Sequence, residues 1–179
     1  MRIIDKRPKI SRRAFLQAGG ATALVAATVT PSGVVTGNAW AATPKALKPE
    51  TFATLVQMSR DIYPHDRFAD SIYAAAVEGL DSGATADDGA KKLLEDGVAA
   101  LNASAQSAHK ADFAAVGWEV DRLSLLRAIE TGGFFQKVRG HLVTGLYNQP
   151  KVWELLGYEG ESASKGGYIN RGFGDIDWL

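Results

Sequence analysis

Across residues 49–156, apolar side chains recur every three or four positions, and no stretch of any length alternates between apolar and polar residues. The first spacing is typical of amphipathic helices, whereas alternation would indicate half-buried strands. Proline and glycine divide the pattern into segments. We therefore predict an all-α fold, a compact bundle of about five helices around one core. A C-terminal tail rich in glycine and aromatic residues, 157–179, is expected to be irregular.

Local signals set the expected helix boundaries. Pro49 suits the first turn of a helix, and Pro64 ends that helix just before it. Asp87 or Asp88 is a suitable N-cap, and Gly157 is placed to cap the last short helix. The predicted helices cover residues 49–63, 67–80, 88–103, 112–130, 134–148 and 152–156. Residues 104–110 are expected to be a loop or a frayed helix end.

Two of these helices have distinctive surfaces. Residues 112–130 carry apolar side chains on more than one face, which is typical of a helix at the centre of a bundle. The helix that begins near Asp88 has Gly97 and several alanines in its apolar stripe. Small residues in that stripe would let another helix approach closely.

A second constraint precedes the helical region. Ser11, Arg12, Arg13, one spacer, and then Phe15 and Leu16 stand before an uncharged, mildly apolar stretch. This order resembles the twin-arginine export signal of bacteria, which a translocase reads as an address. The resemblance implies that the chain crosses the inner membrane already folded. We therefore expect a periplasmic protein exported by the twin-arginine route.

The stretch behind the arginines fits a cleaved signal. Ala39 and Ala41 place small residues around a cleavage point, so residues 1–41 are predicted to be the signal and 42–179 the helical domain. The alternative is a chance pair of arginines ahead of a transmembrane helix. Against it, the run is weakly hydrophobic and is interrupted by glycine and proline, where a spanning helix needs about 20 strongly apolar residues.

No cofactor, metal or catalytic site is predicted in this chain. It contains no cysteine, which excludes cysteine-ligated iron–sulfur clusters, c-type haem attachment and disulfides. Glycine motifs for dinucleotides or phosphates are absent, and His65, His109 and His141 lack the spacing of a metal site. His65, beside Asp66, is expected to have a capping or surface role, and His141 to make a hydrogen bond at the edge of the core.

The charge balance argues against a nucleic-acid partner. The predicted signal carries six basic side chains and one acidic one, while the formal charge of the whole chain is zero. By subtraction, the helical domain has a net charge of about −5, and a nucleic-acid binder would usually show a basic face.

The tail concentrates large aromatic side chains between glycines. Each ring carries a large apolar area that needs a surface to cover it, and aromatic residues are frequent anchors of protein interfaces. Two interpretations stay open: the tail wraps its own helical domain, or part of it docks on another protein. The candidate interface residues are Trp153, Tyr158, Tyr168, Phe173 and Trp178.

Motifs spread along most of the chain point to one family. Besides the twin-arginine signal, they are Asp-Ile-Tyr-Pro-His-Asp at 61–66, Phe-Phe at 134–135, Tyr-Asn-Gln-Pro at 147–150, Trp153, Leu-Gly-Tyr-Glu-Gly at 156–160, and the segment from Gly-Gly-Tyr at 166–168 to Asp-Trp at 177–178. Together they resemble the gluconate 2-dehydrogenase subunit 3 family.

The resemblance implies a small, non-catalytic, cofactor-free subunit of a periplasmic flavin-dependent dehydrogenase of sugars, sugar acids or alcohols. Its implied partners are a large FAD-binding subunit of the glucose–methanol–choline (GMC) oxidoreductase type, a cytochrome c subunit and the twin-arginine translocase. The small subunit would supply the export signal for the folded flavoprotein, stabilise it, and be held at the membrane through the complex. The alternative is a stand-alone periplasmic helical binding protein, or an unrecognised cofactor-free enzyme.

Overall fold

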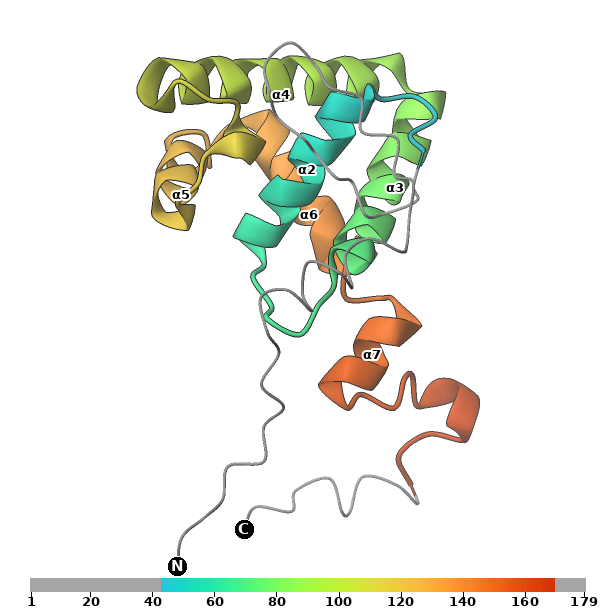
Figure 1. The fold of residues 1–179 in the computed structure, drawn as a ribbon. Helices are drawn as coiled ribbons and strands as arrows, with labels where there is room; N and C mark the ends of the chain where they lie inside the picture. The colour runs from blue at the N-terminus through green and yellow to red at the C-terminus, as the bar shows by residue number, and fades with distance from the viewer. Residues whose placement is uncertain (1–42, 170–179) are drawn as a thin grey trace, which may run out of the picture. The chain divides into compact units, whose positions relative to one another are not determined.

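The computed structural model describes residues 43–169, and all regular structure in that range is helical (Figure 1). This confirms the all-α prediction. The elements are α2 (Pro49–Ile62), α3 (Asp70–Ala86), α4 (Asp88–His109), a 3₁₀ turn η1 (Phe113–Ala115), α5 (Glu119–Ala128), α6 (Gly133–Gly145), α7 (Pro150–Leu156) and a 3₁₀ turn η2 (Ala163–Lys165). The export-signal residues Ser11, Arg12, Arg13, Phe15 and Leu16, the cleavage residues Ala39 and Ala41, and the tail residues Phe173 and Trp178 lie outside the described residues.

The core is built by α2, α3, α4 and α6. Figure 1 shows α4 crossing one end of α2 and α3, with α7 below their other end. Helix α2 contributes Phe52, Leu55 and Met58, spaced three residues apart and all at most 2 % exposed. Helix α6 contributes Val138 and Leu142, which are fully buried. The apolar stripes predicted for these helices are therefore the faces that meet in the core.

Helices α3 and α4 are both longer than predicted. Helix α3 continues past Gly83 to Ala86, because Ala84 is 1 % exposed and still belongs to the core face. Helix α4 runs to His109, so residues 104–109 are regular helix where a loop or a frayed helix end was expected. Ala105 extends the buried stripe of that helix and is fully buried. Alanine has the highest helix propensity, and the alanines at 103, 105 and 108 favour helix in this polar segment.

The central helix predicted at 112–130 is also wrong. The chain there forms η1, then an extended piece through Trp118, and then α5, in which Leu126 is the one buried residue. Phe113 and Val116 enter the core before α5 begins. The apolar residues crowded more than one helical face because the segment is not a single helix.

A carboxylate anchors the segment in front of α2. Asp81 of α3 accepts three backbone N–H groups, from Lys45 at 2.7 Å, Ala46 at 3.0 Å and Leu47 at 2.8 Å. Burial opposes the charge, but these donors outweigh it and hold the pKa of Asp81 below its ordinary value. The carboxylate therefore stabilises the fold above the unfolded-state pKa of about 4, and this contribution is lost as the pH falls through the lowered folded-state pKa.

Gly97 lies where α4 and α6 approach each other. A Cβ at this position would stand 2.2 Å from Cγ of the Phe134 ring, which packs in the core. We expect Gly97→Ala to lower the free energy of unfolding by about 1–3 kcal/mol, because the buried ring has to move. Chemical denaturation followed by circular dichroism measures the change.

Gly83 of α3 is the matched control, since a Cβ there meets nothing within 4 Å. Gly83→Ala should stabilise the protein by about 0.4–1 kcal/mol, because the unfolded chain loses conformational freedom. Equal shifts for the two variants would contradict a close approach of α4 and α6 at Gly97.

Candidate functional site

The turn between α2 and α3, residues 63–69, is held by one buried phenol. Tyr63 caps α2, with its N–H bonded to the Ser59 carbonyl at 3.1 Å, and Pro64 then turns the chain away. The fully buried Tyr73 donates its hydroxyl to the Tyr63 carbonyl at 2.7 Å and accepts the His65 N–H at 3.1 Å. Burial raises the pKa of Tyr73 above its ordinary value, so the hydroxyl keeps the proton that it donates.

His65 joins this turn to the chain that follows α6. Its ring stacks on Phe68 with centroids 4.2 Å apart, and its Nε2 lies 2.7 Å from the hydroxyl of Tyr147. Tyr147 also meets Tyr63 edge to face at 5.7 Å. Burial raises the pKa of Tyr147, as does the neighbouring Tyr63. The half-buried His65 is thus a connecting residue, beyond the capping or surface role expected for it.

Helix α7 is attached through the same tyrosine. The indole Nε1 of Trp153 donates to the Tyr147 carbonyl at 2.7 Å, and the Trp153 ring meets Tyr158 edge to face at 5.6 Å. Val152 is the one α7 residue that is fully buried. Gly157 caps α7 with a φ of 74°, as predicted from its position. Trp153, a candidate interface residue, is therefore turned toward its own domain.

These contacts bring together the motifs at 61–66 and 147–158, which are far apart in the sequence. Tyr63, His65, Phe68, Tyr73, Tyr147 and Trp153 form one connected group, which we call the aromatic joint. Its members come from two regions of the chain, 63–73 and 147–153. The joint positions α7 relative to the bundle. It does so through ring packing and hydrogen bonds, which are structural contacts.

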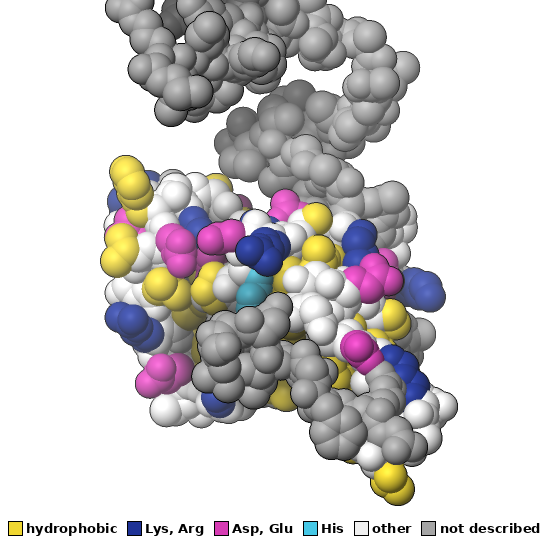
Figure 2. All heavy atoms as spheres, turned by 90° about the horizontal axis from the view of Figure 1, so that it is seen from below, with side chains coloured by type: hydrophobic (Ala, Val, Ile, Leu, Met, Phe, Trp, Pro, Cys, Tyr) yellow, Lys and Arg dark blue, Asp and Glu magenta, His cyan; other side chains and the backbone are white. Residues whose placement is uncertain are grey.

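Beyond the joint, α7 and the start of the tail expose apolar side chains. The exposed fractions are 38 % for Leu155, 55 % for Leu156, 49 % for Tyr158, 64 % for Tyr168 and 85 % for Ile169. We call these five residues the α7–tail patch. A hollow of about 440 Å³ lies between α7 and the turn at 63–69. It is lined by Pro64, His65, Asp66, Arg67, Phe68, Leu155 and Leu156. On the face seen in Figure 2, exposed apolar side chains lie among charges of both signs.

A buried ion pair fastens α5 to α2. Arg122 bonds Asp61 through Nε at 2.7 Å and Nη2 at 2.9 Å, and its Nη1 donates to the Val116 carbonyl at 2.7 Å. Gln57 donates to the same carboxylate at 3.1 Å. The hydrogen bonds to Asp61 raise the pKa of Arg122 above its ordinary value. Asp61 belongs to the 61–66 motif, so that motif supports both the aromatic joint and the position of α5.

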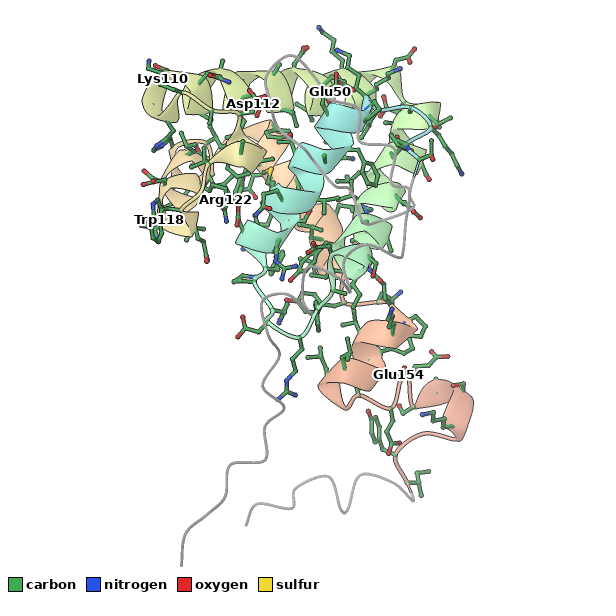
Figure 3. The ribbon with its side chains drawn as sticks, viewed as in Figure 1. Glu50, Lys110, Asp112, Trp118, Arg122 and Glu154 are labelled. Carbon is green, nitrogen blue, oxygen red and sulfur yellow. The ribbon has the colours of Figure 1, made fainter. Side chains whose placement is uncertain are left out.

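The sequence pattern predicted the wrong environment for Trp118. It was expected within a central helix, yet 76 % of it is exposed, and Val120 nearby is 69 % exposed. Figure 3 shows Trp118 at the outer end of α5, with Arg122 nearer the bundle. Gly117 directly precedes Trp118, and because glycine disfavours helix interiors, it was a local signal that could have placed this tryptophan outside a regular helix.

The histidines do not converge in the described residues. Nε2 of His141 lies 2.9 Å from the Ala76 carbonyl, which confirms its expected place at the core edge. Nδ1 of His109 lies 3.9 Å from a carboxylate oxygen of Asp121. Between residues 43 and 169, no group of three or more histidine or acidic side chains is arranged to hold a metal ion. No helix in that range is long and apolar enough to cross a bilayer.

The described part of the chain is thus a small helical domain. Two motifs that are distant in sequence form the aromatic joint, and the α7–tail patch follows it along the chain. A model of the family described as gluconate 2-dehydrogenase subunit 3 matches residues 49–160, from the start of α2 to just beyond α7. This match covers more than half of the chain, and the chain belongs to that family. No curated protein and no solved structure shows a significant match to this chain.

Proposed function

We propose that the chain is the non-catalytic small subunit of a periplasmic FAD-dependent dehydrogenase of sugars, sugar acids or alcohols. It carries the twin-arginine signal, by which the translocase exports the folded GMC-type flavoprotein together with this chain. It also stabilises that partner. A cytochrome c subunit completes the complex and holds it at the membrane. Membership of the gluconate 2-dehydrogenase subunit 3 family is the observation that carries this proposal.

The α7–tail patch is the surface that best suits the flavoprotein. Its five exposed apolar residues fall within 15 positions of the chain, and α7 itself buries only Val152. Large exposed apolar side chains gathered in one short segment of a secreted protein mark a binding site or an aggregation liability. The two interpretations of the tail therefore apply to different rings: Trp153 packs inward on Tyr147, while Tyr158 and Tyr168 are available to a partner.

A double substitution in the patch tests this interface. We expect Leu156→Ser with Tyr168→Ser to weaken binding of the flavoprotein by about 2 kcal/mol or more, roughly thirtyfold in affinity, because both anchors lose apolar contact. Both side chains are more than half exposed in the described structure, so the fold should persist. The dissociation constant is measured on the complex purified from the periplasm, in which the flavin spectrum identifies the partner.

The control replaces exposed apolar residues outside the patch, Leu93→Ser on α4 with Val120→Ser on α5. This variant should bind the flavoprotein like the wild type. If both double variants bind equally well, the patch is not the interface. If wild-type chain purifies from the periplasm without any flavoprotein, the proposed function itself is wrong.

A further inference from the structure

A groove opens on the bundle where the end of α2 meets α5 and α6. Its volume is about 600 Å³. The apolar part of its lining comes from Ile62, Leu123, Leu126 and Phe135, of which Leu126 is buried and the other three are partly exposed. An apolar surface of this size can accommodate one or two side chains of a bound segment.

Two arginines flank this apolar lining. Arg127 of α5 and Arg139 of α6 both line the groove and are both exposed. Within residues 43–169, neither guanidinium has a hydrogen bond or an ion pair. Two acidic residues also line the groove. Asp61 is already bonded by Arg122 and Gln57, and the carboxylate of the exposed Glu130 forms no ion pair with either arginine within residues 43–169. Two unpaired guanidinium groups beside apolar side chains are suited to bind a carboxylate.

The groove is linked through shared lining residues to the surface proposed above for the flavoprotein. It shares Asp61 with a neighbouring polar hollow of about 450 Å³. That hollow in turn shares Pro64 and His65 with the one between the turn and α7. A single bound segment could therefore follow the surface from α5 and α6, past the turn, to Leu155 and Leu156.

We propose that this groove binds an acidic, partly apolar segment of the flavoprotein subunit, with a carboxylate on Arg127 and Arg139 and an apolar side chain against Phe135. The assignment rests on the proposed function, since it extends the same interface. Charge complementarity supports it: the domain as a whole carries a net charge of about −5, whereas in the groove the two unpaired arginines outnumber the one unpaired acidic side chain, Glu130.

The test is charge reversal in the assembled complex. Arg127→Glu with Arg139→Glu should raise the dissociation constant for the purified flavin-containing partner by about tenfold or more, because carboxylates would then face the acidic segment. The wild-type dissociation constant should rise with salt between 50 and 300 mM, roughly the range over which surface charges become screened, and the variant should lack that rise. Lys91→Glu with Lys137→Glu is the matched control, because it makes the same change in net charge at exposed positions that do not line the groove.

Three outcomes overturn the inference, and they are distinguishable. If the wild type forms no complex with a flavoprotein, the proposed function fails and the groove assignment fails with it. If the complex forms and both double variants bind alike, only the groove assignment is wrong. If the isolated chain binds a small carboxylate such as gluconate or decanoate, and the arginine variant loses that binding while keeping the partner, the groove is a small-molecule site. Circular dichroism checks that each variant remains folded.

Discussion

Replacing Arg12 and Arg13 together with lysine is expected to leave the chain in the cytoplasm. The two arginines would act as one recognition unit for the translocase, and lysine cannot reproduce the planar, multiply donating guanidinium group. The expected effect is near-complete loss of the periplasmic protein. Because the flavoprotein is proposed to travel with this chain, its flavin absorbance should disappear from the periplasm as well. Immunoblots and visible spectra of the two cell fractions measure both effects.

Arg2→Lys with Arg7→Lys is the matched control, since it changes two other arginines that precede the motif. That variant should be exported normally. Unchanged periplasmic levels of the Arg12 and Arg13 variant would show that the motif is not an export signal. Loss of this chain from the periplasm, with the flavoprotein still exported, would contradict the escort role while leaving the signal intact.

Removing the carboxylate of Asp61 should destabilise the domain strongly. Asp61→Ala would leave the Arg122 guanidinium buried, with 13 % of its side chain exposed, and without its counterion. Breaking one side of a buried ion pair typically costs about 3–5 kcal/mol, because the remaining charge is desolvated and unpaired. Helix α5 and the Val116 segment should loosen first, since Arg122 connects both of them to α2. Urea denaturation followed by circular dichroism measures the loss.

Two further variants separate the ion pair from a general effect of lost charge. Asp70→Ala removes the partner of Arg60 in a pair that is largely exposed, and it should cost about 0–1 kcal/mol. The double change Asp61→Leu with Arg122→Met should recover much of the stability lost in Asp61→Ala, because no unpaired charge stays buried. A loss below about 1 kcal/mol for Asp61→Ala would show that this ion pair does not hold α5 in place.

Most of the helical architecture could be predicted because its signals are local. Pro49 and Pro64 bracket α2, Asp87 accepts the Ala90 N–H at the start of α4, and Gly157 ends α7 in the left-handed conformation. Each of these depends on the backbone geometry of one or two residues, which the residue type alone restricts. Family membership could be recognised from the sequence for the same reason, since its motifs are short and contiguous.

These local sequence signals did not determine which large side chains are buried and which are exposed. Trp153 was a candidate interface residue and is bonded to Tyr147, whereas Trp118 was expected within a central helix and is 76 % exposed. The sequence shows that both are large apolar residues, but not which surface covers them. For these two residues burial depends on where distant helices pack, which the apolar spacing along one segment does not specify.

The sequence by itself therefore determined the fold class, several helix boundaries and the family, because helix formation and capping are settled within a few neighbouring residues. Only the tertiary structure decided which residues cooperate. Asp61 and Arg122 are 61 positions apart, and His65 and Tyr147 are 82 apart, yet each pair meets within hydrogen-bond distance. Such contacts form when helices dock through their apolar faces, and that docking brings together polar groups whose pairing no local spacing could indicate.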